Sequence, residues 1–262
     1  MIIEALLIGA FVGIVVGSLG AGGGILSVPI LVYLLGQDPH QATGLSLIIV
    51  GLTAAVSLAT RARGTDVAWR EGSLFALAGL AGTWAGSTLG PLVSASTLML
   101  SFCALLGVVA LFMVRSHLSP VSSLPKAPVS QAAPSGVSTL VRVVVLATAT
   151  GFLTGFFGVG GGFAIVPALH LALRYPMKRA SATSLLVMVI TAAFGVVSRS
   201  LADSFTITAE AGVMVALFTA ASMAGGIVGA RVTTRVPNRV LGLVFAALLV
   251  GVALSTLVAT LS

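Results

Sequence analysis

The sequence predicts an all-α polytopic membrane protein made of two inverted repeats, each with about five helical elements that include a glycine-interrupted broken hairpin. The composition is the first indication: 58% of the 262 residues are hydrophobic and 7% are charged, whereas soluble domains carry about a quarter charged residues. The second is a set of apolar runs near the roughly 20 residues that a helix needs to cross a bilayer core. These runs are apolar on all sides, unlike the alternating strands of a membrane barrel. The third is an internal repeat.

The repeat joins residues 13–31 to residues 151–169, which lie 138 positions later. Nine of the nineteen aligned positions are identical in these two segments, and five of the nine are glycines in the run from position 17 to position 24. The offset continues downstream and pairs Ala42 with Ala180, Ser46 with Ser184, Thr53 with Thr191, and Arg61 with Arg199. The sequence therefore predicts an N-terminal repeat over 1–115 and a C-terminal repeat over 140–262.

Eight long apolar runs predict the membrane spans. They cover 2–20, 42–60, 72–90 and 95–114 in the first repeat, and 140–158, 180–198, 210–230 and 238–260 in the second. Between the first two spans of each repeat, a shorter run follows the glycine cluster, at 24–36 and at 162–174. Thirteen helical residues cover only about 20 Å, so we expect each glycine-rich segment to form a broken hairpin with its glycine turn near the centre of the membrane.

The segment 116–139 separates the two repeats. It contains four prolines among Ser, Ala and Gln residues, a composition typical of a flexible linker. We expect this linker to lie in the cytoplasm and to carry no chemistry.

The basic residues predict the orientation of the chain. If each glycine-rich segment enters the membrane and returns, twelve of the thirteen Lys and Arg residues fall on one side, and Arg199 alone falls on the other. A single crossing of each segment would instead give seven against six. The positive-inside rule then places both termini outside the cytoplasm. Eleven Arg against two Lys is typical of a GC-rich bacterial genome, so we expect a multi-pass protein of a bacterial cytoplasmic (inner) membrane.

The glycine clusters are the candidate binding site. The first N–H groups of a helix have no partner within the helix, and glycine leaves them open to a ligand. Two such N-termini that meet near the midplane would form a donor-rich site suited to an oxyanion. The candidate residues are Gly20, Gly22, Gly23 and Gly24 with Gly158, Gly160, Gly161 and Gly162. Four further pairs predict close helix packing instead: Gly13/Gly17, Gly82/Gly86, Gly151/Gly155 and Gly225/Gly229.

Hydroxyl side chains could complete the site. Ser46, Ser184, Thr53 and Thr191 lie seven residues apart within each repeat and so on one helical face. They either line the pocket or bond a carbonyl of their own helix, and the sequence leaves both open. It also leaves open whether Arg199 attracts an anion, caps a helix or contacts a lipid headgroup.

Several other functions are disfavoured. The one cysteine and three histidines are scattered, so neither a metal cluster nor a nucleophile–base pair is expected, and we expect no enzyme and no cofactor. The net charge of +7 arises between the apolar segments, so it indicates topology and not nucleic-acid binding.

The doubled motif Gly17-x-x-Gly20-x-Gly22-Gly23-Gly24-x-x-x-Val28-Pro29, with its copy that begins at Gly155, resembles the sulfite exporter TauE/SafE family of membrane permeases. The resemblance covers the chain apart from the linker. It implies transport, often outward, of sulfite, organosulfonates or related sulfur-containing anions across the cytoplasmic membrane. We therefore expect an exporter of a small anion that works by alternating access in the lipid bilayer, with homo-oligomer formation left open. The alternatives are an anion channel and a non-transport membrane subunit of a larger complex.

Overall fold

The computed structural model describes residues 2–20, 23–34, 36–62, 67–118, 137–173, 175–201 and 209–261, and these residues form helices and no strand. The first repeat contains α1 (Ile2–Leu19), α2 (Gly23–Pro29), a π-helical turn η1 (Ile30–Leu34), α3 (Pro39–Arg61), α4 (Trp69–Leu89), a 3₁₀ turn η2 (Gly90–Leu92) and α5 (Ala95–Leu118). The second contains α6 (Val137–Phe157), α7 (Gly162–Leu173), α8 (Met177–Leu201), α9 (Ala209–Arg235) and α10 (Asn238–Leu261). The predicted linker coincides with the ends of α5 and α6 and otherwise lies outside the described residues.

The all-helical membrane architecture is confirmed. Each of the eight predicted spans coincides with a long helix, and each short run with a short helix. Within the described residues, four stretches are long and apolar enough to cross a membrane: α3, α8, Val215–Arg235 of α9 and Asn238–Val258 of α10. Shorter apolar stretches lie in α1, α5 and α6.

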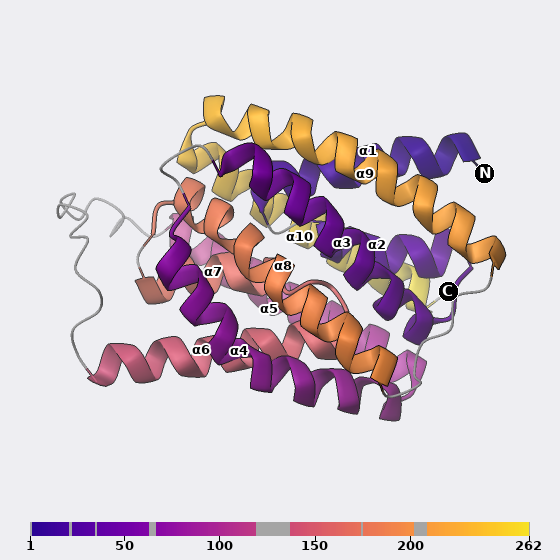
Figure 1. Cartoon of the computed structure of the whole chain (residues 1–262), viewed down its shortest axis with the longest axis horizontal. Coiled ribbons are helices and arrows are strands. Elements are labelled where there is room, and N and C mark those ends of the chain that lie inside the picture. Colours follow the sequence, from indigo (N-terminus) through magenta and orange to yellow (C-terminus); the bar gives the residue numbers. More distant parts are fainter. Residues whose placement is uncertain are drawn as a thin grey trace.

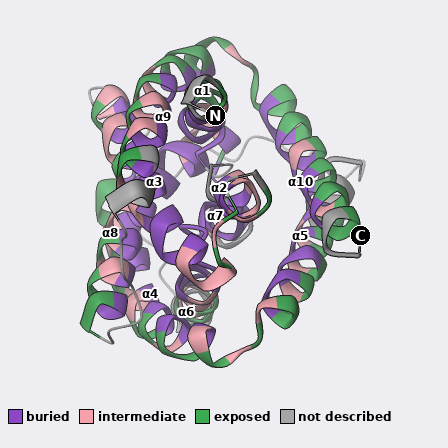
Figure 2. Cartoon of the chain, turned by 90° about the vertical axis from the view of Figure 1, so that its right-hand side faces the viewer, coloured by how far each residue is buried: buried purple, intermediate pink, exposed green. Residues whose placement is uncertain are grey.

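The two short helices lie in the interior of the bundle. Figure 2 shows α2 and α7 side by side at the centre, with α5 and α10 on the right and α3 and α8 on the left. Helices α1 and α9 lie above them, and α4 and α6 lie below. The centre of the bundle is buried and its outer rim is exposed (Figure 2). Large apolar side chains are exposed on that rim, including Leu111 of α5 and Leu254 of α10. Such a rim suits contact with lipid, as expected for a multi-pass membrane protein.

In two places, a helix of one repeat has its main packing partner in the other repeat. Helix α1 packs along α9 of the other repeat, and α6 packs in the same way along α4 (Figure 1). A β-carbon at Gly13 would overlap the carbonyl oxygen of Ser222, and one at Gly17 would overlap that of Gly226. The predicted close packing is therefore confirmed, because only a hydrogen atom fits at these positions. The same approach to a carbonyl oxygen occurs at Gly82, Gly86, Gly151, Gly155, Gly225 and Gly229.

One pair of equivalent helices, α3 and α8, runs in opposite directions. Helices α3 and α8 occupy matching places in the repeats and pack antiparallel at the centre of their contact. Gly51 of α3 faces Ala192 of α8, while Leu47, one turn earlier in α3, contacts Gly195, nearly one turn later in α8. Both termini lie at the same end of the molecule (Figure 1). The orientation of these ends relative to the cytoplasm stays a prediction.

Candidate functional site

The turns before the short helices require glycine. Gly20 has φ +66°, and Gly158, Gly160 and Gly161 have φ between +63° and +67°. An L-amino acid with a side chain rarely adopts this left-handed conformation, so the repeated glycines set the path of the chain. Gly23 and Gly162 are the first residues of α2 and α7, and Gly24 follows in the first turn of α2. Gly22 lies outside the described residues.

Each glycine turn is held by a serine of the other repeat. The Ser184 hydroxyl of α8 donates to the carbonyl oxygen of Gly20 at 2.6 Å and to that of Ser181 at 2.8 Å. The Ser46 hydroxyl of α3 donates to the carbonyl oxygen of Gly158 and, at 3.1 Å, to that of Thr43. Ser46 and Ser184 are equivalent residues, and so are Gly20 and Gly158. We call these two reciprocal contacts the serine–glycine latches.

The latches leave no space for a side chain on the first glycine of each turn. A β-carbon at Gly20 would overlap the Ser181 carbonyl oxygen, and one at Gly158 would overlap the Thr43 carbonyl oxygen. The turn of the second repeat then runs inward. Gly160 packs against Val50, which lies halfway along α3, and near Met188, which lies close to the middle of α8. This turn thus reaches the middle of the bundle, at the buried N-terminus of α7.

Backbone donors are concentrated at this N-terminus. The Gly158 N–H donates to Thr154 at 3.0 Å, and the Ala164 and Ile165 N–H groups donate to Gly161 at 2.9 and 2.8 Å. In the described part of the chain, none of the backbone hydrogen bonds outside the helices is donated by an N–H group of residues 160–162. These donors lie among residues that are all buried. That they form an anion site stays a prediction.

The two threonines of the candidate site differ from each other. Thr191 donates to the carbonyl oxygen of Val187 in its own helix at 2.9 Å. Its equivalent, Thr53, is fully buried, and its hydroxyl has no hydrogen-bond partner among the described residues. The same is true of Ser57, one turn further along α3. Both side chains approach Gly226 of α9, so they belong to the contact between α3 and α9.

Two equivalent arginines cap the ends of α1 and α6. Arg199, 2% exposed, donates through Nη2 to the carbonyl oxygen of Gly155 at 2.8 Å. Arg61, 8% exposed, donates through Nη2 to Gly17 at 2.8 Å and to Ser18 at 3.1 Å. A cation at a helix C-terminus opposes the helix dipole. The sequence left three roles open for Arg199, and the structure shows that this residue caps the end of α6.

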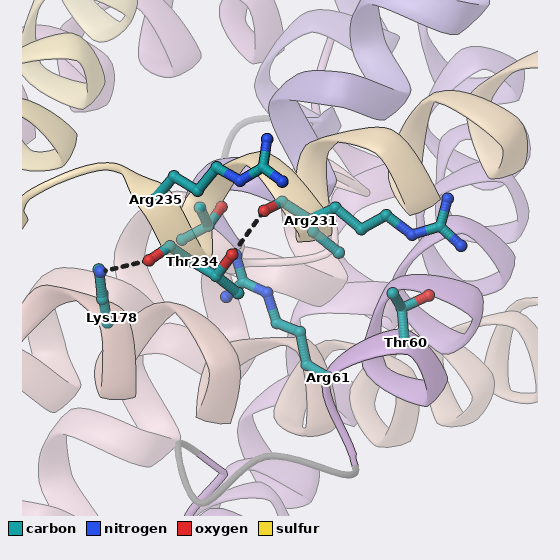
Figure 3. A pocket seen from close by; sticks show the side chains of 8 residues that line it. Thr60, Arg61, Lys178, Arg231, Thr234 and Arg235 are labelled. Carbon is teal, nitrogen blue, oxygen red and sulfur yellow. Dashed lines mark hydrogen bonds between the residues drawn. The ribbon is translucent and has the colours of Figure 1, made fainter.

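A cavity of about 340 Å³ lies where α3, α8 and α9 meet. Figure 3 shows Arg61 rising from α3 towards Thr234, Lys178 approaching from α8, and Arg231 and Arg235 extending from α9. The lining consists of Thr60, Arg61, Lys178, Ala230, Arg231, Thr233, Thr234 and Arg235, with four basic residues and no carboxylate. Sequence reasoning missed this cavity, because its residues come from three segments and their charges were read as a topology signal only.

The described residues contain no group of three His, Cys, Asp or Glu side chains that could hold a metal ion. The structure thus offers backbone donors, hydroxyls and buried arginines as its polar features.

Comparison with known proteins identifies the family. The chain is 37% identical over 193 residues to a probable membrane transporter protein of Xylella fastidiosa, a match that covers 72% of this chain and 71% of that protein. It is 31% identical over 212 residues to a probable membrane transporter protein of Bacillus subtilis, with coverage of 73% and 75%. No solved structure matches the chain. A model of the family described as sulfite exporter TauE/SafE matches residues 5–256, so the chain belongs to this family of membrane transporters.

Proposed function

We propose that this protein exports a small sulfur-containing anion, such as sulfite or an organosulfonate, by alternating access around the two glycine turns. The observation that carries the proposal is the pair of serine–glycine latches: Ser184 binds Gly20, and Ser46 binds Gly158. Each repeat holds the broken helix of the other, so a movement of one repeat against the other changes the surroundings of both turns. Such coupling around a central site is the basis of alternating access in transporters built from repeats.

The chemistry of the turns favours an oxyanion. Buried irregular backbone in a membrane is tolerated where it faces protein or a polar cavity. N–H groups at the start of a helix stabilise negative charge without a formal positive charge. The N–H groups of Gly20 and Gly158 are bonded to the carbonyl oxygens of Val16 and Thr154, so these two glycines shape the turns and are not donors. We expect Gly22, Gly23 and Gly24 with Gly160, Gly161 and Gly162 to donate to the anion. We expect Ser46, Ser184, Thr53 and Thr191 to form the walls of the site around these donors.

The inverted arrangement is part of this proposal. Each repeat has five helices, and the equivalent helices α3 and α8 run antiparallel. An odd number of elements and a charge bias of twelve to one together support repeats of opposite orientation, with both termini outside the cytoplasm. Symmetric repeats of this kind allow the transporter two related conformations, each open to a different side of the membrane.

An anion channel is the second candidate, because the same broken helices could line a continuous pore. A non-transport subunit of a larger complex is the third. Reconstitution of the purified chain separates the three. A carrier gives saturable uptake with counterflow, a channel gives single-channel currents, and a subunit gives neither.

The direct test is uptake of labelled sulfite into proteoliposomes. Sulfate, thiosulfate, sulfoacetate, an aryl sulfonate and chloride serve as competitors that rank the transported anions. Saturable uptake that one class of sulfur anion inhibits would support the proposal. Absence of uptake for every anion, from protein that remains folded and monodisperse, would contradict it.

The latches provide a sharper prediction. Ser184→Ala removes a hydrogen bond of 2.6 Å to Gly20 without adding volume, so the protein should fold while the turn loses its fixed position. A buried hydrogen bond contributes about 1 kcal/mol, and we expect uptake to fall about fivefold or more in Ser46→Ala and in Ser184→Ala alike. Ser101→Ala is the matched control, because within the described residues Ser101 bonds carbonyls of its own helix and of no other. Equal uptake by all three variants would show that the latches do not serve transport.

A further inference from the structure

The cavity between α3, α8 and α9 concentrates positive charge at one end of the bundle. Its volume of about 340 Å³ falls in the range of about 300–1,000 Å³ that is typical of small-molecule pockets. Arg61, Lys178, Arg231 and Arg235 line it. Four like charges around one cavity repel each other, and a bound anion relieves this repulsion.

Two of the cations are held in place by carbonyl groups. Arg61 is 8% exposed, and its guanidinium is fixed by Gly17, Ser18 and, through Nη1 at 3.0 Å, by the Ser181 hydroxyl. Lys178 donates through Nζ to the carbonyl oxygen of Thr234 at 3.0 Å (Figure 3). An ammonium group has three donors, so this contact leaves Lys178 able to bind a ligand as well. A pre-positioned charge loses little conformational entropy when a ligand arrives.

The neighbouring backbone is also fixed. The N–H group of Lys178 donates to the Asn238 side chain at 3.0 Å, which joins the start of α8 to the start of α10. The Thr233 hydroxyl donates to Ser18 at 2.7 Å and joins α9 to the end of α1. The cavity is thus built on anchored helix ends.

A seam of buried hydroxyls leads inward from this cavity. Ser57 lies one turn before Arg61 on α3, and Thr53 lies one turn before Ser57. Both are fully buried without a hydrogen-bond partner among the described residues. They face Gly226, which lies one turn before Ala230 of the cavity wall on α9. Unpartnered buried hydroxyls are uncommon in proteins, and here they continue the polar surface of the cavity into the bundle.

We propose that this cavity is an oxyanion-binding site that takes a sulfate, sulfonate or phosphate group. Lys178 contacts the anion from α8, Arg61 forms the fixed positive floor, and Arg231 and Arg235 contribute positive charge from α9. The site lies where the basic residues predict the cytoplasm. The proposal goes beyond the transport function, and it holds whichever anion the glycine turns carry.

The test is sulfate binding to the purified full-length chain in nanodiscs of neutral phosphatidylcholine, measured by isothermal titration calorimetry. We expect saturable binding that weakens as the concentration of sodium chloride rises, because screening reduces the attraction. The basic side chains around the cavity attract the anion together, so Arg231→Gln should lower the affinity about tenfold. The double variant Lys178→Gln/Arg231→Gln should lower it further.

The controls separate charge from folding. Arg70→Gln removes one exposed positive charge outside the cavity lining and should leave sulfate affinity within about twofold of the wild type. Arg231 is exposed, so its substitution should also leave the melting temperature unchanged. Sulfate affinity that is the same in the wild type, in Arg231→Gln and in the double variant would overturn the proposal, as would absence of binding.

A second lipid composition identifies the natural source of the oxyanion. Nanodiscs with phosphatidylglycerol offer phosphate headgroups that compete with sulfate if the cavity takes a lipid. Weaker sulfate binding in these nanodiscs, seen in the wild type and absent from the double variant, would assign the site to a headgroup. Unchanged binding would assign it to a free anion. Both results support an oxyanion site.

Transport and binding can fail separately. If charge-dependent sulfate binding is absent but sulfite uptake is normal, the proposed anion site is wrong and the proposed transport function stands. If charge-dependent sulfate binding is present but no anion is taken up, the proposed transport function is wrong and the proposed anion site stands.

Discussion

Replacement of Gly17 by leucine is expected to prevent the chain from folding. The β-carbon alone would overlap the carbonyl oxygen of Gly226 and approach the amide nitrogen of Ala230 at 2.9 Å. These atoms belong to the backbone of α9 and cannot move as a flexible side chain does. Helices α1 and α9 would have to separate along their whole contact, which is the most extensive between any two helices of the described chain. Gly155→Leu should have the same effect on α6 and α4, because its β-carbon would overlap Thr83.

The measurement is the yield of monodisperse protein after extraction in mild detergent, followed by thermal unfolding. Gly107→Leu and Gly251→Leu are the matched controls. Both glycines are exposed, on α5 and α10, and a β-carbon at either meets no atom within 4 Å. We expect near wild-type yield for the controls and almost none for Gly17→Leu. Comparable yields for Gly17→Leu and Gly107→Leu would mean that the close contact of α1 and α9 is not needed for the fold.

Substitution of the buried arginines is expected to have the next largest effect. Arg199→Met leaves the Gly155 carbonyl oxygen without its cation, and a hydrogen bond to a charged group contributes about 1.5–3 kcal/mol. Arg61→Met removes three contacts, to Gly17, Ser18 and Ser181, so it should destabilise the protein more than Arg199→Met does. Thermal unfolding of the detergent-solubilised variants measures both losses.

Lysine at the same positions separates charge from geometry. Lysine keeps the positive charge but lacks the planar fork of arginine, so it should restore part of the lost stability at position 199 and less at position 61, where two carbonyls and a hydroxyl are bound together. Arg70→Met, which removes an exposed arginine, should leave the melting temperature unchanged. A ranking with Arg199→Met more damaging than Arg61→Met would contradict the account of the caps.

The sequence was sufficient to predict the helices and the glycine contacts within the membrane. Apolar runs set the spans, because a bilayer core imposes a length of about 20 residues. Gly13 and Gly17 were assigned to helix packing because their spacing of four places both on one face. The local conformation at Gly20 and Gly158 also agrees with the sequence, since glycine permits the positive φ that is observed.

The sequence could not predict which repeat each helix packs against. An internal repeat shows that two units share one fold, but the latches bind Ser184 to Gly20 and Ser46 to Gly158 across the two units. It could not separate the roles of Thr53 and Thr191, because their different partners lie on neighbouring helices. The sequence also led us to treat Arg61, like the exposed basic residues, as an indicator of topology only. A count of charges does not show which of them are buried.

The packing of α1 against a helix of the other repeat has a consequence for biosynthesis. The hydrogen bond from Ser222 to Gly9 joins residues that are 213 positions apart, and α1 has its main partner in α9. When the first helices leave the ribosome, the glycine face of α1 has only lipid or the insertion machinery to contact. Synthesis proceeds at about 5–20 residues per second, so this face waits on the order of ten seconds or more for its partner. The N-terminal half alone is therefore an incomplete folding unit, which membrane proteases should degrade unless the C-terminal half is supplied, even as a separate polypeptide.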